Sequence, residues 1–328
     1  MQYSVNYKKG GNIMKKLVIL EPLGVNEEDL LKWIFESLGD EVEVTLYSDR
    51  AVTDDQMIER AKDANYVVIA NQPMSEYVLE GLKNIELLAV AFTGFDHIPI
   101  LKCKERGITV CNASGYSNQA VCDLVFGMAI ALLRNLRECD NVVRQGGTLQ
   151  GLVGQELSAL TFGVIGTGAI GSQVIKVAQA FGAKVVAYNR SVKPLENVDF
   201  LPLHEVMEKS DIISLHLPIN ETTKGIIGRE EINLMKKNAI LINCGRGPLV
   251  DIDALADALH QNLIGGAAID VFYTEPPLEE NHPLFTTPNT LLTPHVAFAT
   301  NEAFVKRAHI VIDNIKAYVN KQPVNVVS

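Results

Sequence analysis

Short runs of aliphatic and β-branched residues alternate with amphipathic stretches along most of the chain. In the first hundred or so residues, the runs 16–20, 42–46, 66–70 and 87–92 are typical of strands, and the segments 27–38, 53–62 and 75–82 have helical periodicity. This alternation is the pattern of parallel strands joined by crossover helices. It predicts a first α/β unit that ends near Asn112.

A second series of the same kind begins near Phe162. Its predicted strands are 162–166, 184–188, 211–217, 239–244, 265–271 and 290–294. Helices are expected between them, and Asp251 is placed to cap the one that runs through Leu255 and Leu259. A final helix, about 302–319, has no strand after it.

Between the two series, residues 117–139 read as one long helix. Its apolar face is too broad for a surface helix, so we expect it to be buried between domains or subunits. The longest apolar stretch, 124–133, is shorter than the roughly 20 residues that a membrane span requires. A membrane protein is therefore not predicted.

Composition narrows the class of protein. A chain of 328 residues with 47% hydrophobic and 21% charged residues is expected to form about two globular domains. The formal charge of −10 argues against nucleic acid or an anionic membrane as a partner. The five cysteines are widely spaced and show no metal-ligand pattern, which favours reduced thiols in the cytoplasm and no metal site. Residues 1–13 lack the apolar run of a signal peptide and are expected to form a loose extension.

The sharpest local signal is a GxGxxG motif formed by Gly166, Gly168 and Gly171. Glycine-rich turns often have only backbone reasons to exist, but this one follows the strand 161–165 and opens a helix that Gly182 ends. In such a βαβ unit the glycines allow a tight turn, close approach to a pyrophosphate and close helix packing. The motif therefore predicts a dinucleotide site in which Ala169 and Ile170 begin the helix beneath the pyrophosphate.

Three residues, Arg246, Glu275 and His295, form the second signal. Taken singly, each residue also has a purely structural explanation: a surface ion pair for Arg246, a solvated turn for Glu275 and packing at a strand end for His295. Each follows an apolar β run, however, and open α/β sheets bind ligands at the carboxyl ends of their strands. A guanidinium can hold a carboxylate, an imidazole can transfer a proton, and a carboxylate can orient the imidazole.

Other motifs add little chemistry. His216, beside Pro218, is expected to pack or to form a cofactor wall rather than to transfer a proton. Patterns typical of serine hydrolases, zincins and kinases are absent from the sequence.

Several long segments resemble the D-isomer-specific 2-hydroxyacid dehydrogenases in the order found in that family. They are GTGAIG, SLHLPINETTKGIIG, LMKKNAILINCGRGPLVDIDAL, AAIDVFYTEPP and TLLTPHVAFAT. The resemblance implies two doubly wound parallel-sheet α/β domains with a cleft between them. Residues 14–114 and 299–328 would form a flavodoxin-like substrate domain, and residues 115–298 a Rossmann NAD(P)-binding domain. This explains a final helix with no strand after it.

The resemblance also implies roles for single residues. It makes Arg246, Glu275 and His295 the catalytic residues, with Arg246 and His295 also touching the substrate. It implies a nicotinamide contact for Asp270 and a substrate-carboxylate loop at Phe92, Thr93 and Gly94. Further cofactor contacts are expected at the following positions: His216, Pro218 and Cys244.

The segments 115–121 and 293–303 look most like the glycerate dehydrogenase and hydroxypyruvate or glyoxylate reductase branch, which often has Trp where this chain has Phe298. The expected activity is hydride transfer between NAD(P)H and a small 2-oxo or D-2-hydroxy acid, by a homodimer. Alternatives are oxidation of 3-phosphoglycerate or another small anion, and a non-catalytic protein that senses dinucleotides. The sequence does not identify the acid or the physiological direction.

The cofactor preference depends on the end of the strand 184–188. The acidic residue that would bind the ribose 2′-hydroxyl of NAD is missing, and Asn189, Arg190 and Ser191 stand there, followed by Lys193. These residues are expected to contact the adenosine ribose. The cofactor is NADP or NAD. Because no acidic residue stands there to repel a 2′-phosphate, the sequence favours NADP.

Overall fold

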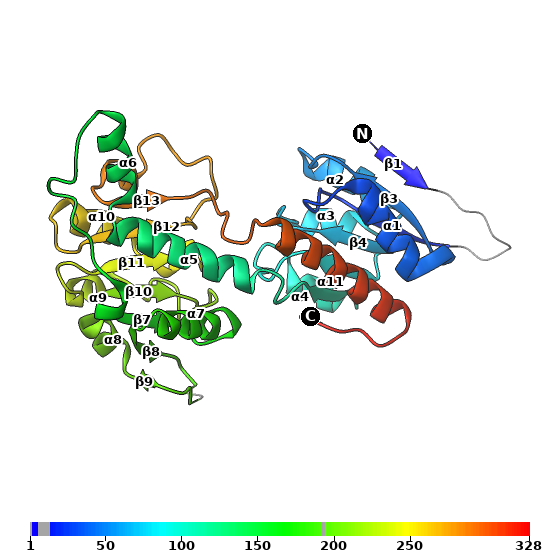
Figure 1. Ribbon diagram of the computed structural model, residues 1–328. Helices are drawn as coiled ribbons and strands as arrows, with labels where there is room; N and C mark the ends of the chain where they lie inside the picture. Colours follow the sequence, from blue (N-terminus) through cyan, green and yellow to red (C-terminus); the bar gives the residue numbers. More distant parts are fainter. Residues whose placement is uncertain (1, 6–13, 192–193) are drawn as a thin grey trace. The chain divides into compact units, whose positions relative to one another are not determined.

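The structure is a computed structural model that describes residues 2–5, 14–191 and 194–328. It divides into two compact units, Met1–Ser117 with Ala299–Ser328, and Asn118–Phe298 (Figure 1). Each unit is an α/β domain built on a largely parallel sheet, as the sequence predicts. The predicted boundaries at 114/115 and 298/299 lie close to these divisions and stay a proposal for the functional domains.

The first unit has the strand order β1-β3-β2-β4-β5-β6 within the described residues. Its strands are β1 (Gln2–Val5), β2 (Lys15–Ile19), β3 (Val42–Tyr47), β4 (Tyr66–Ile69), β5 (Leu87–Val90) and β6 (Thr109–Asn112). From β3 to β6 the strands are parallel, in the flavodoxin-like order 2-1-3-4-5. The strand order reverses between β2 and β4, and such reversals are where these folds bind ligands.

Helices cover this sheet. They are α1 (Glu27–Leu38), α2 (Asp54–Ala61), α3 (Glu76–Gly81), α4 (Ile100–Glu105) and α11 (Asn301–Val319), with a short 3₁₀ helix η1 (Gly39–Glu41). Although α11 is at the other end of the sequence, it packs beside α1 and against β5 (Figure 1). Every residue of β4 and β5 is buried, as expected for parallel strands covered on both faces.

The second unit has the strand order β13-β12-β11-β10-β7-β8-β9 within the described residues. Its strands are β7 (Thr161–Ile165), β8 (Lys184–Tyr188), β9 (Val198–Phe200), β10 (Ile212–Leu215), β11 (Ile240–Asn243), β12 (Gly266–Ile269) and β13 (Thr290–Leu292). All the pairings are parallel, and the order is that of a Rossmann fold with one further strand beside β12.

Two apolar clusters fill the two faces of this sheet. The helices are α5 (Asn118–Leu133), α6 (Leu136–Arg144), α7 (Ala169–Ala180), α8 (Leu203–Lys209), α9 (Arg229–Leu234) and α10 (Ile252–His260), with η2 (Leu157–Ala159), η3 (Gly247–Leu249) and η4 (Pro283–Thr286). Helices α5 and α7 pack on one face, and α8, α9 and α10 on the other. Asp251 caps α10 as predicted, because its side chain accepts from Ala254 N.

The structure corrects several predictions. Gln2–Val5 is not part of a loose extension, because Tyr3 and Val5 alternate with polar residues and pair antiparallel with β3; residues 6–13 lie outside the described residues. The predicted single helix 117–139 is two helices, since Asn135 has a φ of 49°, a left-handed conformation that asparagine tolerates. The short elements β6, β9 and α4 were not predicted.

Among the described residues, no single helix is long and apolar enough to cross a membrane. Helices α5 and α6 reach such a length and apolar composition only together, and a bend of 56° separates them.

Candidate active site

The three predicted catalytic residues follow three neighbouring strands of the second sheet. Arg246 follows β11, Glu275 lies in the loop after β12, and His295 follows β13. Because these strands are parallel, their carboxyl ends meet at one edge of the sheet. The strand order alone therefore places the three side chains on one side of the second unit.

Glu275 and His295 are in direct contact. The imidazole Nδ1 of His295 lies 2.8 Å from Oε1 of Glu275, a hydrogen-bond distance. The His295 side chain is largely buried, at 19% exposed, while that of Glu275 is 55% exposed. The ring of Phe298 stands edge-on to the imidazole, with 5.5 Å between ring centroids. Two sides of the imidazole are thus fixed by a carboxylate and an aromatic ring.

The loop that carries His295 is attached to Asp270. The Asp270 side chain is 0% exposed and accepts hydrogen bonds from Thr293 Oγ1, Val296 N (2.8 Å) and Ala297 N (3.0 Å). In addition, His295 N donates to the Asp270 carbonyl oxygen at 2.8 Å. His295 itself has a φ of 53°, which costs energy for any residue with a Cβ. The contacts to Asp270 hold it in this conformation.

Arg246 stands in a tight turn after β11. Asn243, which is fully buried, donates from Nδ2 to Arg246 O (2.9 Å) and accepts from Gly245 N (3.1 Å). A Cβ at Gly247 would meet Phe272 O at 2.0 Å, so only glycine fits after Arg246. The roles of Asn243 and Thr293 as supports were not predicted, because an Asn or Thr at a strand end is too common to mark a site.

The GxGxxG turn lies at the reversal of strand order between β7 and β10. Gly166 has a φ of 97°, and a Cβ at Gly171 would meet Gly166 O at 1.9 Å. At Gly168, by contrast, an added Cβ would have nothing within 4 Å, and no side chain caps the first turn of α7. Open space above uncapped N–H groups at the start of a helix fits a pyrophosphate. Ala169 and Ile170 form the first turn of that helix, as predicted.

The residues predicted to contact the ribose follow β8. Asn189 accepts from Thr167 N at 3.2 Å and donates to Ser191 O at 2.7 Å, so its amide links the glycine turn to this loop. Arg190 and Ser191 are exposed, and Lys193 lies outside the described residues. No carboxylate stands at these described positions.

His216 and Cys244 lie at the ends of β10 and β11. Desolvation lowers the pKa of His216 to about 4, so the ring is neutral near pH 7, and its Nε2 lies 2.9 Å from Ser214 Oγ. Pro218 follows in the same segment. Burial raises the pKa of the Cys244 thiol well above its ordinary value, and its Sγ contacts Met128. Cys244 is therefore an inert thiol, and these residues can serve as a wall rather than as acids or nucleophiles.

The predicted carboxylate loop belongs to the first unit, where Phe92, Thr93 and Gly94 follow β5. Phe92 is buried, and the guanidinium of Arg307 lies over its ring. Asn112 Nδ2 donates to Thr93 O at 2.7 Å, and Ala113 N donates to Phe92 O at 2.9 Å. These bonds fix the loop backbone.

A family model agrees with this architecture. Residues 126–297 match the NAD binding domain of the D-isomer specific 2-hydroxyacid dehydrogenases. The chain belongs to this family. It is accordingly an oxidoreductase with an NAD-binding domain, as the sequence predicts.

Two relatives align with most of the length of this dehydrogenase. It is 38% identical over 283 residues to a glycerate dehydrogenase of Methylorubrum extorquens, covering 84% of this chain and 89% of the relative. It is 37% identical over 310 residues to a D-3-phosphoglycerate dehydrogenase of Methanocaldococcus jannaschii, covering 92% of this chain. The match spans only 57% of the length of that second relative.

Solved structures share the fold. An acyclic imino acid reductase in complex with NADPH and D-Arg has a TM-score of 0.87 and 30% identity, with 95% of this chain and 100% of that chain covered. A D-lactate dehydrogenase from Aquifex aeolicus, complexed with NAD and lactic acid, has a TM-score of 0.81 and 30% identity, with 94% and 96% covered. The two complexes hold different dinucleotides.

In the described part of the dehydrogenase, no group of three His, Cys, Asp or Glu side chains is arranged to hold a metal ion.

The two glycines of the pyrophosphate turn give a matched pair of variants. Gly171→Ala should lower the free energy of unfolding by about 1–3 kcal/mol or more, because its methyl group collides with backbone. Gly168→Ala should keep near-parental stability but raise the Kd for NAD(P)H roughly tenfold, which is about 1.4 kcal/mol. Chemical denaturation and fluorescence titration measure the two effects. Equal loss of stability in both variants would contradict the assignment.

The desolvated ring of His216 should make the fold sensitive to acid. Its pKa is about 4 in the folded chain against an ordinary value of 6.5, so the unfolded chain binds more protons between these pH values. Stability should therefore fall as the pH drops from 6.5 toward 4. His216→Gln should weaken this dependence, and His204→Gln, at an exposed histidine, is the control. Denaturation curves at pH 7.5 and 5 that shift equally in all three proteins would exclude His216 as the cause.

Proposed function

We propose that this dehydrogenase reduces a small 2-oxo acid, such as glyoxylate or hydroxypyruvate, to the D-2-hydroxy acid, with His295 as the proton donor. The observation that carries the proposal is the 2.8 Å contact between Glu275 and His295. An imidazole fixed by a carboxylate is the arrangement that general acid–base catalysis requires. The names of the relatives, glycerate dehydrogenase among them, support this substrate class.

A bound nicotinamide dinucleotide would supply the hydride, and the residues of this chain would bind it, orient the substrate and move the proton. With Nδ1 of His295 directed at Glu275, Nε2 is the nitrogen that can give its proton to the carbonyl oxygen as the adjacent carbon is reduced. In the reverse direction the same nitrogen takes the proton from the hydroxyl group. Glu275 orients the ring through its contact with Nδ1.

Arg246 is proposed to bind the substrate carboxylate and to polarise the oxo group. A guanidinium offers two parallel N–H groups to a planar carboxylate. The rigid turn made by Asn243 and Gly247 limits the conformations of Arg246. The backbone N–H groups of Thr93 and Gly94 are proposed to share the carboxylate.

The best test is a panel of initial rates. Glyoxylate, hydroxypyruvate, pyruvate and branched 2-oxo acids, each with NADH and with NADPH, would identify the substrate class. 3-Phosphoglycerate remains an alternative substrate, since one relative carries that name. A purely dinucleotide-sensing role has less support, because it does not need the Glu275–His295 pair.

We also propose a cytoplasmic homodimer. Helix α6 has no buried residue, and Leu136 and Val143 on it are 49% and 71% exposed. Apolar side chains on an exposed helix favour a contact with a second subunit. The five cysteines are free thiols, which is consistent with a reducing compartment.

His295→Asn should reduce kcat about a hundredfold or more, because the general acid is lost, while the Kd for the dinucleotide stays near the parental value. Glu275→Gln should reduce kcat less, because the imidazole keeps its place in the loop but loses the carboxylate that orients it. Stopped-flow and steady-state kinetics measure both. A His295→Asn enzyme with near-parental turnover would refute the proposed role.

NADPH should be used at least as well as NADH. No described carboxylate follows β8 to repel a 2′-phosphate, and the exposed Arg190 and Ser191 can bind one. A charge-assisted hydrogen bond of about 1.5–3 kcal/mol corresponds to roughly ten- to a hundredfold in affinity. Arg190→Ala should therefore raise the KM for NADPH and leave that for NADH nearly unchanged. A parent enzyme that strongly prefers NADH would contradict the prediction.

A further inference from the structure

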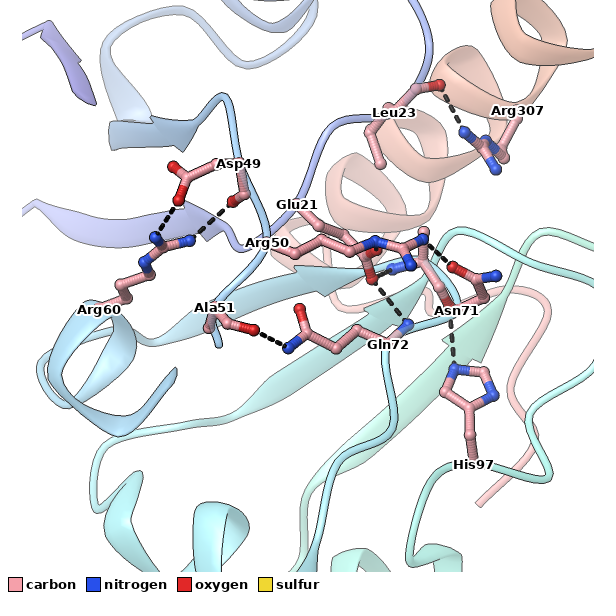
Figure 2. A network of polar contacts seen from close by, with 11 residues as sticks. Glu21, Leu23, Asp49, Arg50, Ala51, Arg60, Asn71, Gln72, His97 and Arg307 are labelled. Atoms are coloured by element: carbon pink, nitrogen blue, oxygen red, sulfur yellow. Dashed lines mark hydrogen bonds and ion pairs between the residues drawn. The ribbon is translucent and has the colours of Figure 1, made fainter. Parts of the chain in front are cut away.

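A second polar cluster lies in the first unit, at the carboxyl ends of neighbouring strands. Glu21 follows β2, Arg50 follows β3, and Asn71 and Gln72 follow β4 (Figure 2). Thr93, in the proposed carboxylate loop, follows β5. The cluster therefore lies at the reversal of strand order between β2 and β4, which is the usual ligand position in a flavodoxin-like sheet.

Glu21 is the fixed centre of this cluster. Its side chain is 0% exposed, and Oε1 accepts from Ala70 N (2.7 Å) and Gln72 N (3.0 Å). Oε2 lies 2.9 Å from Arg50 Nε. A buried carboxylate is costly unless a cation compensates it. Glu21 therefore holds the Arg50 guanidinium in place, and Arg50 Nη2 is held further by Asn71 Oδ1.

Arg50 nevertheless faces outward, since 57% of its side chain is exposed. A guanidinium has five N–H donors, and the contacts with Glu21 and Asn71 leave donors for a ligand. The carboxylate that balances its charge is buried behind it. A molecule that approaches this edge of the sheet thus meets hydrogen-bond donors rather than the carboxylate.

Unsatisfied polar atoms concentrate in the same place. Among the described residues, the buried side-chain atoms without a hydrogen-bond partner include Gln72 Oε1, Thr93 Oγ1 and Arg307 Nε, whereas Glu21 Oε2 makes its ion pair with Arg50. All belong to this cluster or to the proposed carboxylate loop that Arg307 supports from behind. Buried polar atoms are rarely left unsatisfied in native proteins, so such a concentration points to a site for a polar ligand with its ordered water.

The ionic groups of the polar network are Arg50, Arg60, Arg307, Glu21 and Asp49 (Figure 2). Asp49 pairs with Arg60 at 2.7 Å, and Glu21 pairs with Arg50 at 2.9 Å. The remaining guanidinium, that of Arg307, is buried. Arg50 is thus a neutralised but exposed donor, which favours an oxygen-rich ligand.

We propose that Arg50 determines substrate specificity by binding an oxygen group at the far end of the 2-oxo acid, either a hydroxyl group or an anionic group. This inference rests on the proposed function, because it takes the C1 carboxylate to lie on the loop of Thr93. Arg50 contacts Asn71, which follows β4, and Thr93 follows the neighbouring strand β5; paired strands are spaced by about 4.8 Å. A three-carbon acid with an oxygen group on C3 is long enough to join the two.

The test is a comparison of kcat/KM for glyoxylate, pyruvate, hydroxypyruvate and 3-phosphohydroxypyruvate. In Arg50→Met the preference for hydroxypyruvate, or for its phosphate ester, over glyoxylate should fall by roughly ten- to a hundredfold, mainly through KM. A loss confined to hydroxypyruvate identifies a hydroxyl site, and a larger loss with the phosphate ester identifies an anion site. Arg229→Met, which removes another exposed arginine that pairs with a carboxylate, should leave the ratios unchanged.

Loss of Arg50 leaves Glu21 buried without its cation, so Arg50→Met can be unstable. The double variant Glu21→Gln with Arg50→Met removes the buried charge and keeps an acceptor for Ala70 N and Gln72 N. It should show the same change in preference. The inference is overturned if kcat/KM falls by the same factor for all four acids in both variants. It is also overturned if kcat/KM is unchanged for all of them. A parent enzyme that reduces none of the acids would refute the proposed function and this inference with it.

Discussion

The burial of Asp270 is the interaction on which the geometry around the proposed catalytic residues depends. Its carboxylate and carbonyl together accept four hydrogen bonds from the segment Thr293–Ala297, and this segment places His295 against Glu275. A left-handed histidine would relax to another conformation if the loop were free. Because three acceptor positions of the carboxylate are occupied by its own chain, Asp270 acts first as a support for the loop. Its expected contact with the nicotinamide stays a prediction.

Both units have a parallel sheet whose strand order reverses, with polar or glycine residues at its carboxyl edge. Parallel strands bring the ends of distant segments to one edge, and the reversal of strand order opens space there. In the second unit this space is bordered by Gly166 and His216, and in the first by Glu21 and Asn71. The two edges carry different residues, glycines in the second unit and an exposed arginine in the first. The proposed cofactor and substrate contacts follow this difference.

The sequence predicts the long elements well, because hydrophobic periodicity over ten or more residues is a strong signal. Helix α1 begins and ends where its pattern does, and the strands other than β1, β6 and β9 were located to within a few residues. Strand β9 has three residues and helix α4 has six, so both are too short to show a period. The break at Asn135 depends on one left-handed residue, which helical periodicity on both sides conceals. The prediction of Arg246, Glu275 and His295 depends on a strand-end context that repeats three times, and the structure places all three after neighbouring strands.

What the sequence could not show is which acidic residues are buried. Asp270 and Glu21 are both 0% exposed, and an acid at a strand end is more often solvated. Each is stabilised by backbone N–H groups of the next loop, a partnership that exists only after the strands have paired. Such a carboxylate links the end of one strand to the loop that follows its neighbour. Removing it would leave several backbone donors unsatisfied at once, so its effect on the site would exceed that of any single surface charge. A buried acid at the carboxyl edge of a parallel sheet thus fixes functional loops in both units of this protein.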